Sequence, residues 1–166
     1  MANPDVVLRP CTDADLDALE AWQSTGNTRT HARRFARQRA GTSTYYLATL
    51  GDDPEVFVGS AEIRWDGCLD PVVPRCPEIN GLQVWPEHLQ SRGIGTAMIG
   101  LLEDAARQRD HQVLGLGVID PRPKRLYLRL GYADTGPDYT DRYTWIDEHH
   151  REHQVADAAR WMTKAL

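Results

Sequence analysis

The sequence has no long apolar run and no recognisable leader. None of its apolar stretches approaches the roughly 18 to 20 residues that span a bilayer. The first ten residues, MANPDVVLRP, lack the basic region followed by an apolar stretch that is typical of a secretory signal. We therefore predict a cytoplasmic protein without a membrane segment.

Cysteine is scarce, and its spacing points to no metal or redox motif. The three cysteines are Cys11, Cys68 and Cys76. They form neither a CxxC pair nor a pattern typical of a zinc site, so we interpret them as reduced thiols. Near the end of the chain lies a polar segment with three histidines, His149, His150 and His153. Such a cluster without cysteine is more often a solvated turn than a metal site, and we predict no metal.

Positive charge is also in deficit, with a formal net charge of −5. This argues against a nucleic-acid partner and favours cationic small molecules, because clefts inherit the sign of their surroundings. The exception is the helix-forming stretch 28–40, which contains five arginines: Arg29, Arg33, Arg34, Arg37 and Arg39. A solvated basic helix face is the common explanation, and an anion site for a substrate carboxylate or a cofactor phosphate is the alternative.

The length and the apolar pattern predict one mixed α/β domain over residues 1–166. Periodicity and turn residues predict strands at 6–9, 43–50, 56–65, 79–84, 112–119, 139–146 and 154–166. The same signals predict helices at 12–22, 28–40, 94–105 and 123–130. Local alanine content makes helix the alternative for 155–166.

The segment 78–102 is the centre of this arrangement, because it combines a strand, a glycine-rich turn and a helix. The first N–H groups of a helix lack partners inside it and face the positive end of its dipole, so they bind phosphate well. Gly93 and Gly95 remove side chains that would block those groups, and Arg92 adds a charge.

Two nucleotide motifs are excluded by the residues at this turn. A dinucleotide fingerprint requires Gly or Ala where Met98 stands, and a Walker-type loop requires Gly-Lys-Ser/Thr, which is absent. Neither common nucleotide-binding class therefore explains the turn.

The chain instead resembles the GNAT superfamily of acyl-CoA-dependent N-acetyltransferases. The family signature [Q/R]-x-x-G-x-[G/A] is matched by Gln90, Gly93 and Gly95, and a later family element, L-Y-x-x-x-G-[F/Y], is matched by Leu126–Tyr132. The order of expected elements agrees over nearly the whole chain. Asp120 and Pro123 stand where the family often has Asn and Ala.

This resemblance implies a fold and a co-substrate. The fold would be a three-layer α/β domain whose splayed, mostly antiparallel sheet has about seven strands and about four flanking helices. The co-substrate would be acetyl-CoA. Positions expected to contact it are Leu82, Gln83, Val84, Gln90, Ser91, Arg92, Gly93, Ile94, Gly95, Thr96, Asp120 and Tyr127.

Two candidate catalytic residues follow from the resemblance and from the chemistry. Glu78 matches a position that some family members use as general base, and on a regular strand it would share a face with Asn80, Leu82 and Val84. Glu62 on the preceding strand is the competing base. Tyr127 matches the family's general acid, since a phenol can protonate a departing thiolate.

Strand 112–119 has one face without side chains, because Gly115 and Gly117 lie on it. The two glycines either accommodate a packed helix or leave room for a cofactor tail. If the turn at Gly93 binds a cofactor, the second interpretation is favoured.

The sequence therefore predicts an N-acetyltransferase that transfers an acetyl group from acetyl-CoA to a primary amine of a small molecule, peptide or protein. The rival hypothesis is an inactive module that binds acyl-CoA or a protein partner. The acceptor stays open, because the arginines favour an anionic amine and the net charge favours a polycation. A homodimer is a candidate assembly.

Overall fold

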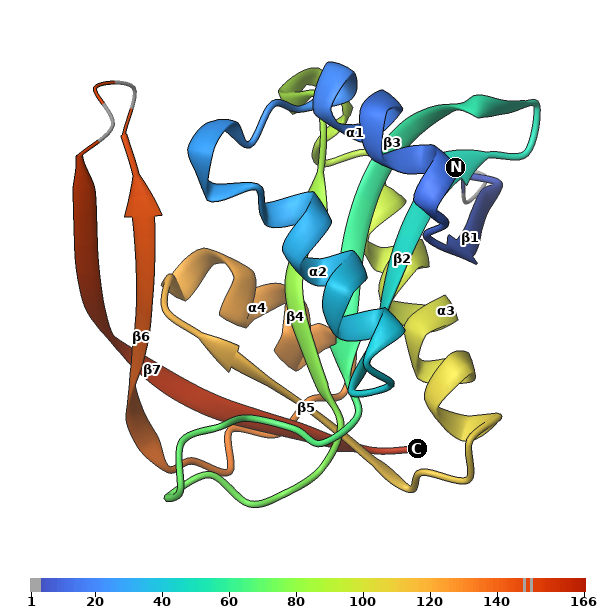
Figure 1. Cartoon of the computed structure of the whole chain (residues 1–166). Helices are drawn as coiled ribbons and strands as arrows, with labels where there is room; N and C mark the ends of the chain where they lie inside the picture. The colour runs from blue at the N-terminus through green and yellow to red at the C-terminus, as the bar shows by residue number, and fades with distance from the viewer. Residues whose placement is uncertain (1–3, 148, 150) are drawn as a thin grey trace.

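A computed structural model describes residues 4–147, 149 and 151–166 of the chain, which form an open sheet covered by helices on both faces (Figure 1). The strands are β1 (Val6–Pro10), β2 (Ser43–Leu50), β3 (Asp53–Arg64), β4 (Glu78–Val84), β5 (Val113–Val118), β6 (Asp138–Ile146) and β7 (Glu152–Ala165). The α-helices are α1 (Leu16–Trp22), α2 (Thr30–Arg39), α3 (Ile94–Arg107) and α4 (Pro121–Arg129). Short 3₁₀ helices are η1 (Asp13–Asp15), η2 (Gly26–Thr28) and η3 (Glu87–Leu89). The predicted mixed α/β fold is confirmed.

The sheet opens in its middle. Its strand order is β1-β2-β3-β4-β5-β7-β6, and only β4 and β5 run parallel among these described strands. That pair is joined at a single register position, Glu78 opposite Gly115, beyond which the two strands diverge (Figure 1). The predicted splay is therefore confirmed, and it lies next to the candidate base Glu78.

Each face of the sheet packs on its own set of helices. On one face, α1 and α2 cover a small apolar core that includes Leu19, Phe35 and Tyr45. On the other face, α3 supplies Met98 and Leu102 to the larger core. The alternating strand residues thus divide between two helical layers, as expected for a sheet buried on both sides.

Several boundaries differ from the sequence prediction for local reasons. Helix α4 begins at Pro121 instead of residue 123, because proline suits the first helical position and the Asp120 carboxylate accepts the Arg122 N–H at 2.9 Å. Helix α2 begins at Thr30, because Arg29 has a φ of 49° and interrupts the helix. The C-terminal segment is strand β7 and not a helix, since its backbone pairs with both β5 and β6. Pairing outweighs the helical propensity of its alanines.

A bulge in β4 overturns the predicted alternation of its side chains. Ser60 of β3 pairs with Gln83 while Glu62 pairs with Asn80, so β4 has one more residue than β3 over this interval. Gly81, with a φ of 61°, lies within it. Glu78 and Asn80 therefore face a cavity, whereas Leu82 and Val84 pack on the α3 core and do not share their face.

The bare face of β5 is filled by aromatic side chains of the C-terminal hairpin. A Cβ at Gly115 would meet the indole of Trp161, and one at Gly117 would meet the hydroxyl of Tyr139. The favoured interpretation, a cofactor tail against these glycines, is therefore wrong. The rings of Tyr139 and Trp161 lie 6.2 Å apart at 74°, an edge-to-face pair that occupies the space.

No helix among the described residues is long and apolar enough to cross a membrane.

Candidate active site

The turn before α3 presents helix amides without a side-chain cap. Gly93 is the N-cap residue, and its φ of 82° is one that residues with a side chain rarely adopt. Among the described residues, no side chain forms a capping hydrogen bond to the start of the helix. A Cβ at Gly95 would meet only the Val84 side chain, at 3.7 Å. Space therefore remains in front of the first amides of a helix of 14 residues, which fits a pyrophosphate.

The residues of the turn that are expected to contact the co-substrate form three groups: exposed side chains, a side chain that ties the turn to β4, and a side chain buried in the core. Ser91, Arg92 and Thr96 are exposed at the turn. The Gln90 side chain donates a hydrogen bond to the Val84 carbonyl at 3.2 Å, which ties the turn to the end of β4. The Ile94 side chain is buried in the core, so only its backbone can face a ligand.

Two of the predicted contacts have other partners in this structure. The Gln83 amide donates to Ser60 Oγ at 3.1 Å and exchanges hydrogen bonds with the amide of Gln23. Its side chain thus faces α1 and not the α3 turn. Asp120 caps α4, as described above.

Tyr127 lies on α4 and packs against the main core. Its ring meets that of Tyr132 edge-on, with centroids 5.8 Å apart. Burial raises the pKa of the Tyr127 hydroxyl, which therefore stays protonated at neutral pH. Within the described part of the chain, that hydroxyl has no hydrogen-bond partner, so its proton is free for donation.

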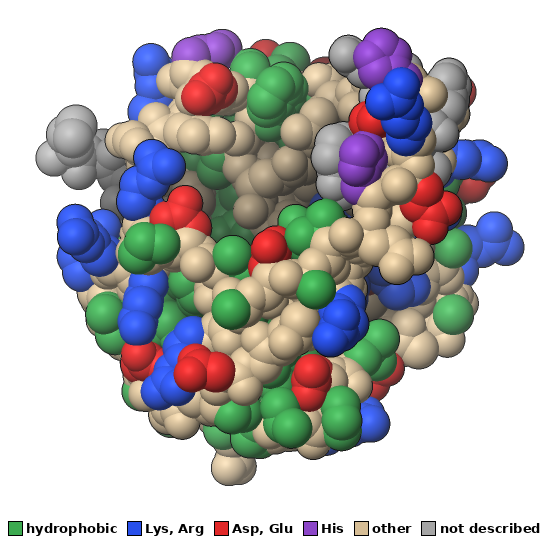
Figure 2. Space-filling view, turned by 90° about the vertical axis from the view of Figure 1, so that its left-hand side faces the viewer, with side chains coloured by type: hydrophobic (Ala, Val, Ile, Leu, Met, Phe, Trp, Pro, Cys, Tyr) green, Lys and Arg blue, Asp and Glu red, His purple; other side chains and the backbone are tan. Residues whose placement is uncertain are grey.

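A cavity of about 560 Å³ lies between α2, β4 and β6. The same side of the molecule is hollowed beside the hairpin tip in the space-filling view (Figure 2). Its lining residues include Arg33, Arg34, Arg37, Arg64, Glu78, Asn80, Tyr139, Asp141 and Arg142. Sequence patterns did not reveal Tyr139, Asp141 and Arg142 as site residues, because only the packing of the β6–β7 hairpin brings them to the cavity. Asn80 lies on β4 two residues after Glu78, and its place in the cavity was also missed.

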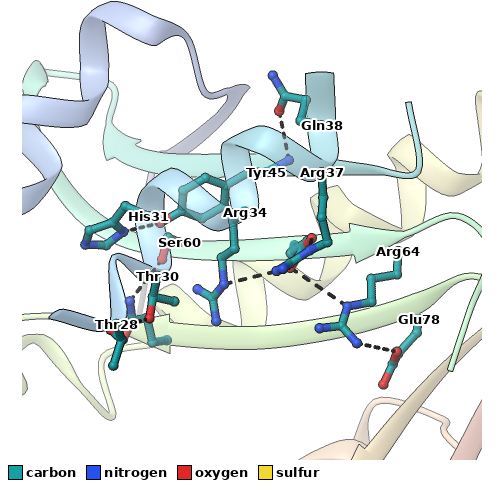
Figure 3. A network of polar contacts seen from close by, with 12 residues as sticks. Thr28, Thr30, His31, Arg34, Arg37, Gln38, Tyr45, Ser60, Arg64 and Glu78 are labelled. Carbon is teal, nitrogen blue, oxygen red and sulfur yellow. Dashed lines mark hydrogen bonds and ion pairs between the residues drawn. The ribbon is translucent and has the colours of Figure 1, made fainter. Parts of the chain in front are cut away.

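Glu78 is the buried carboxylate of this cavity, whose lining also includes Asp141. Its side chain is almost fully buried, and its Oε2 atom has no hydrogen-bond partner among the described residues. The nearest cation is Arg64, whose Nη1 lies 4.0 Å from Oε2 (Figure 3). Burial raises the pKa of Glu78, and the charge of Arg64 offsets only part of that effect. A carboxylate with a raised pKa suits a general base near neutral pH.

Both carboxylate oxygens of Glu62, the competing base, are already paired with arginines. Its side chain has no exposed surface, and both oxygens accept hydrogen bonds from Arg37 at 2.7 Å. Arg34 lies 3.8 Å away and Arg64 4.0 Å away. Burial alone would raise the pKa of Glu62, but the hydrogen bonds from Arg37, the polarity of the Ser43 hydroxyl, and the charges of Arg37 and Arg64 together outweigh it and lower the pKa. Glu62 is therefore a poor proton acceptor.

The arginines of α2 divide between two environments. Arg34 and Arg37 reach from α2 toward the strands, where Arg64 lies beside Glu78 (Figure 3). Arg33 also lines the cavity, whereas Arg39 does not. A purely solvated basic face is thus an incomplete description of this helix.

The histidine segment offers no metal site in the part of the chain that can be described. His153 Nε2 lies 2.8 Å from Asp147 in the polar turn of the hairpin. His150 lies outside the described residues. No group of three or more potential ligands occurs among the others.

The acetyltransferase (GNAT) family matches residues 11–132, most of the chain and both sequence motifs. This protein belongs to the GNAT acetyltransferase family. No curated protein is significantly similar to it in sequence.

Solved structures agree on the fold of this GNAT protein. A spermidine/spermine N-acetyltransferase from Vibrio cholerae, in complex with manganese ions, superposes with a TM-score of 0.67 at 14% identity, over 97% of this chain and 92% of that one. A ribosomal-protein-alanine N-acetyltransferase from Brucella melitensis gives 0.64 at 22%, over 96% and 99%. A GNAT acetyltransferase from Elizabethkingia anophelis with acetyl-CoA bound gives 0.58 at 18%, over 98% and 99%. At these identities the likeness concerns the fold alone.

Proposed function

We propose that this protein transfers an acetyl group from acetyl-CoA to a primary amine by direct attack in a ternary complex. The observation that carries the proposal is Glu78, a buried carboxylate at the cavity where β4 and β5 separate, with one oxygen that has no hydrogen-bond partner in the described part of the chain. The family motifs and the uncapped start of α3 support acetyl-CoA as the donor.

Glu78 addresses the main energetic obstacle of such a reaction. An amine with a pKa near 10 is only about one part in a thousand neutral at pH 7, which costs roughly 4 kcal/mol. In the proposed step Glu78 takes the proton from the amine nitrogen as that nitrogen bonds to the acetyl carbon. Bound acetyl-CoA supplies the activated acyl group.

The remaining groups stabilise charge as the carbon–sulfur bond breaks. Negative charge develops on the acetyl oxygen, and the bulge at Gly81 leaves an N–H of β4 outside the ladder that suits this position. Tyr127 then donates its proton to the departing thiolate sulfur. We further propose that the turn Gln90–Thr96 holds the pyrophosphate.

One assay separates this proposal from a non-catalytic module that binds acyl-CoA. The protein is mixed with acetyl-CoA and a panel of polyamines, amino acids, aminoglycosides and lysyl peptides, and the thiol of CoA is measured over time. Amine-dependent release is expected. Binding of acetyl-CoA without release for any amine would favour the inactive module.

Tyr127→Phe tests the proton donor. Removal of the hydroxyl should lower kcat by about a hundredfold, as for other general acids. Acetyl-CoA affinity, measured by calorimetry, should change little because the ring and its packing on Tyr132 remain. Near-normal turnover would remove Tyr127 from the mechanism.

A further inference from the structure

The cavity beside Glu78 carries more positive than negative charge. Five of its lining residues are arginines: Arg33, Arg34, Arg37, Arg64 and Arg142. Three carboxylates lie in or directly behind this lining: Glu62, Glu78 and Asp141. Two positive charges are therefore uncompensated, although the whole chain has a net charge of −5. A cleft with a surplus of positive charge favours anionic ligands, even when the net charge of the whole protein is negative.

Arg34 directs part of this charge at the candidate reaction centre. Its guanidinium lies over Gly81, where a Cβ would collide with Nη2. The side chain is only 13% exposed and is held by Glu62 at 3.8 Å and by the Tyr45 ring at 5.6 Å. Because Gly81 has no side chain, the Arg34 guanidinium can lie beside the β4 bulge. In the proposed reaction the acetyl group would react next to this bulge.

Arg33 and Arg142 are the adaptable cations at the mouth. Both are exposed, and across the described ranges neither side chain has an ion pair or a hydrogen bond. They come from α2 and β6, two of the elements that line the cavity. Two unpaired guanidinium groups that flank a cavity can bind one anionic group between them without breaking an existing contact.

A polycation lacks matching partners here. Glu62 is fully buried and already occupied by Arg37, which leaves Glu78 and Asp141 to face a ligand. When Glu78 takes a proton from the acceptor, the surplus positive charge of the cavity rises further. Additional ammonium groups on the acceptor would then face arginines.

We propose that the acceptor is a primary amine that also bears an anionic group, a carboxylate or a phosphate, bound by Arg34 with Arg33 and Arg142. This inference rests on the proposed acetyl transfer and names its substrate class. The proposed acceptor differs from spermidine and spermine, which the name of the Vibrio cholerae enzyme gives as its acceptors.

Matched amines test the charge preference. The panel pairs glycine, β-alanine and 4-aminobutyrate each with its own carboxamide, pairs phosphoethanolamine with ethanolamine, and adds spermidine. The anionic member of at least one pair should have a kcat/KM at least about tenfold higher, the effect expected of one charge-assisted hydrogen bond. The pair with the larger ratio distinguishes carboxylate from phosphate. Preference for spermidine or for the neutral members would overturn the proposal.

Single substitutions test which arginines carry the preference. Arg33→Gln and Arg142→Gln should each raise the KM of the anionic amine about tenfold with a smaller change in kcat, and reduce its advantage over the neutral partner. Arg39→Gln is the matched control, since it removes an exposed arginine of the same helix that does not line the cavity. Equal effects of all three substitutions would contradict a specific anion site.

Calorimetry with CoA present measures binding of the same amines without turnover. If no amine releases CoA, the proposed acetyl transfer fails. In that case tighter binding of an anionic member, weakened by Arg33→Gln, still supports the anion site, and equal binding of both members refutes it.

Discussion

Glu62 and Glu78 are two buried glutamates on adjacent strands of one sheet, yet their surroundings push them to opposite chemistry. Glu62 accepts two hydrogen bonds from Arg37 at 2.7 Å and has two further arginines within 4.0 Å. Among the described residues, Glu78 is paired with Arg64 alone, at 4.0 Å, and its Oε2 atom has no hydrogen-bond partner. The pKa of Glu62 is lowered and that of Glu78 is raised.

The difference shows that burial alone does not define a candidate base. Burial favours the neutral form of both carboxyl groups, and the number of nearby guanidinium groups decides the outcome. Glu62 balances arginines that reach across from α2, which is a structural role. Glu78 retains the poorly solvated oxygen that proton transfer needs.

The largest expected effect is on stability, from Glu62→Gln. The substitution leaves Arg37 and Arg34 without their carboxylate partner and leaves Arg64 with Glu78 alone, so the free energy of unfolding should fall by about 3 kcal/mol. Urea unfolding monitored by tryptophan fluorescence measures this.

Glu78→Gln is the control in that experiment. It removes no hydrogen bond to Arg64, because the pair is separated by 4.0 Å, and should cost less than about 1 kcal/mol. Equal losses for the two variants would erase the proposed distinction between a structural and a functional glutamate.

The sequence predicted the turn at Gly93 and the helix that carries Tyr127 better than it predicted the cavity beside Glu78. The turn at Gly93 and the helix with Tyr127 are local motifs, in which glycine and the apolar period specify the backbone within a few residues. The element order and the strand content of β7 also follow from local pattern, although pairing was needed to choose strand over helix.

The cavity beside Glu78 depends on contacts between distant segments. Arg34 meets Gly81, and Asp141 reaches the cavity, only through the register of the sheet and of the β6–β7 hairpin. A one-residue bulge in β4 reversed the predicted side of Leu82, and periodicity alone does not reveal a bulge. The same limit applies to Gly117, whose neighbour Tyr139 lies on another strand.

The second prediction is a loss of turnover without a loss of fold. Glu78→Gln should lower kcat for the preferred amine about a hundredfold, in the range for loss of a general base. A pH profile sharpens the test, because wild-type kcat/KM should fall as the pH drops through the raised pKa of Glu78 and the variant should lose this limb. An unchanged limb would assign the titration to another group.

The smallest effect is a difference in how the two glutamates couple stability to pH. Because the pKa of Glu62 is lowered by folding, its contribution is present above the unfolded value of about 4.3 and is lost as the pH falls through the folded value. The stability gap between wild type and Glu62→Gln should therefore shrink in acid.

Glu78 should show the reverse dependence, because its pKa is raised by folding. Its contribution is fully present below about pH 4.3 and is lost as the pH rises through the folded value, with a slope of at most about 1.4 kcal/mol per pH unit. Glu78→Gln should thus gain stability relative to wild type as the pH rises from about 4.3 through the raised pKa of Glu78, in urea titrations read at fixed ionic strength. A gap that stays constant over that range would mean that Glu78 titrates alike in the folded and unfolded chains, and its buried oxygen would then lack the desolvation that suits it to accept a proton.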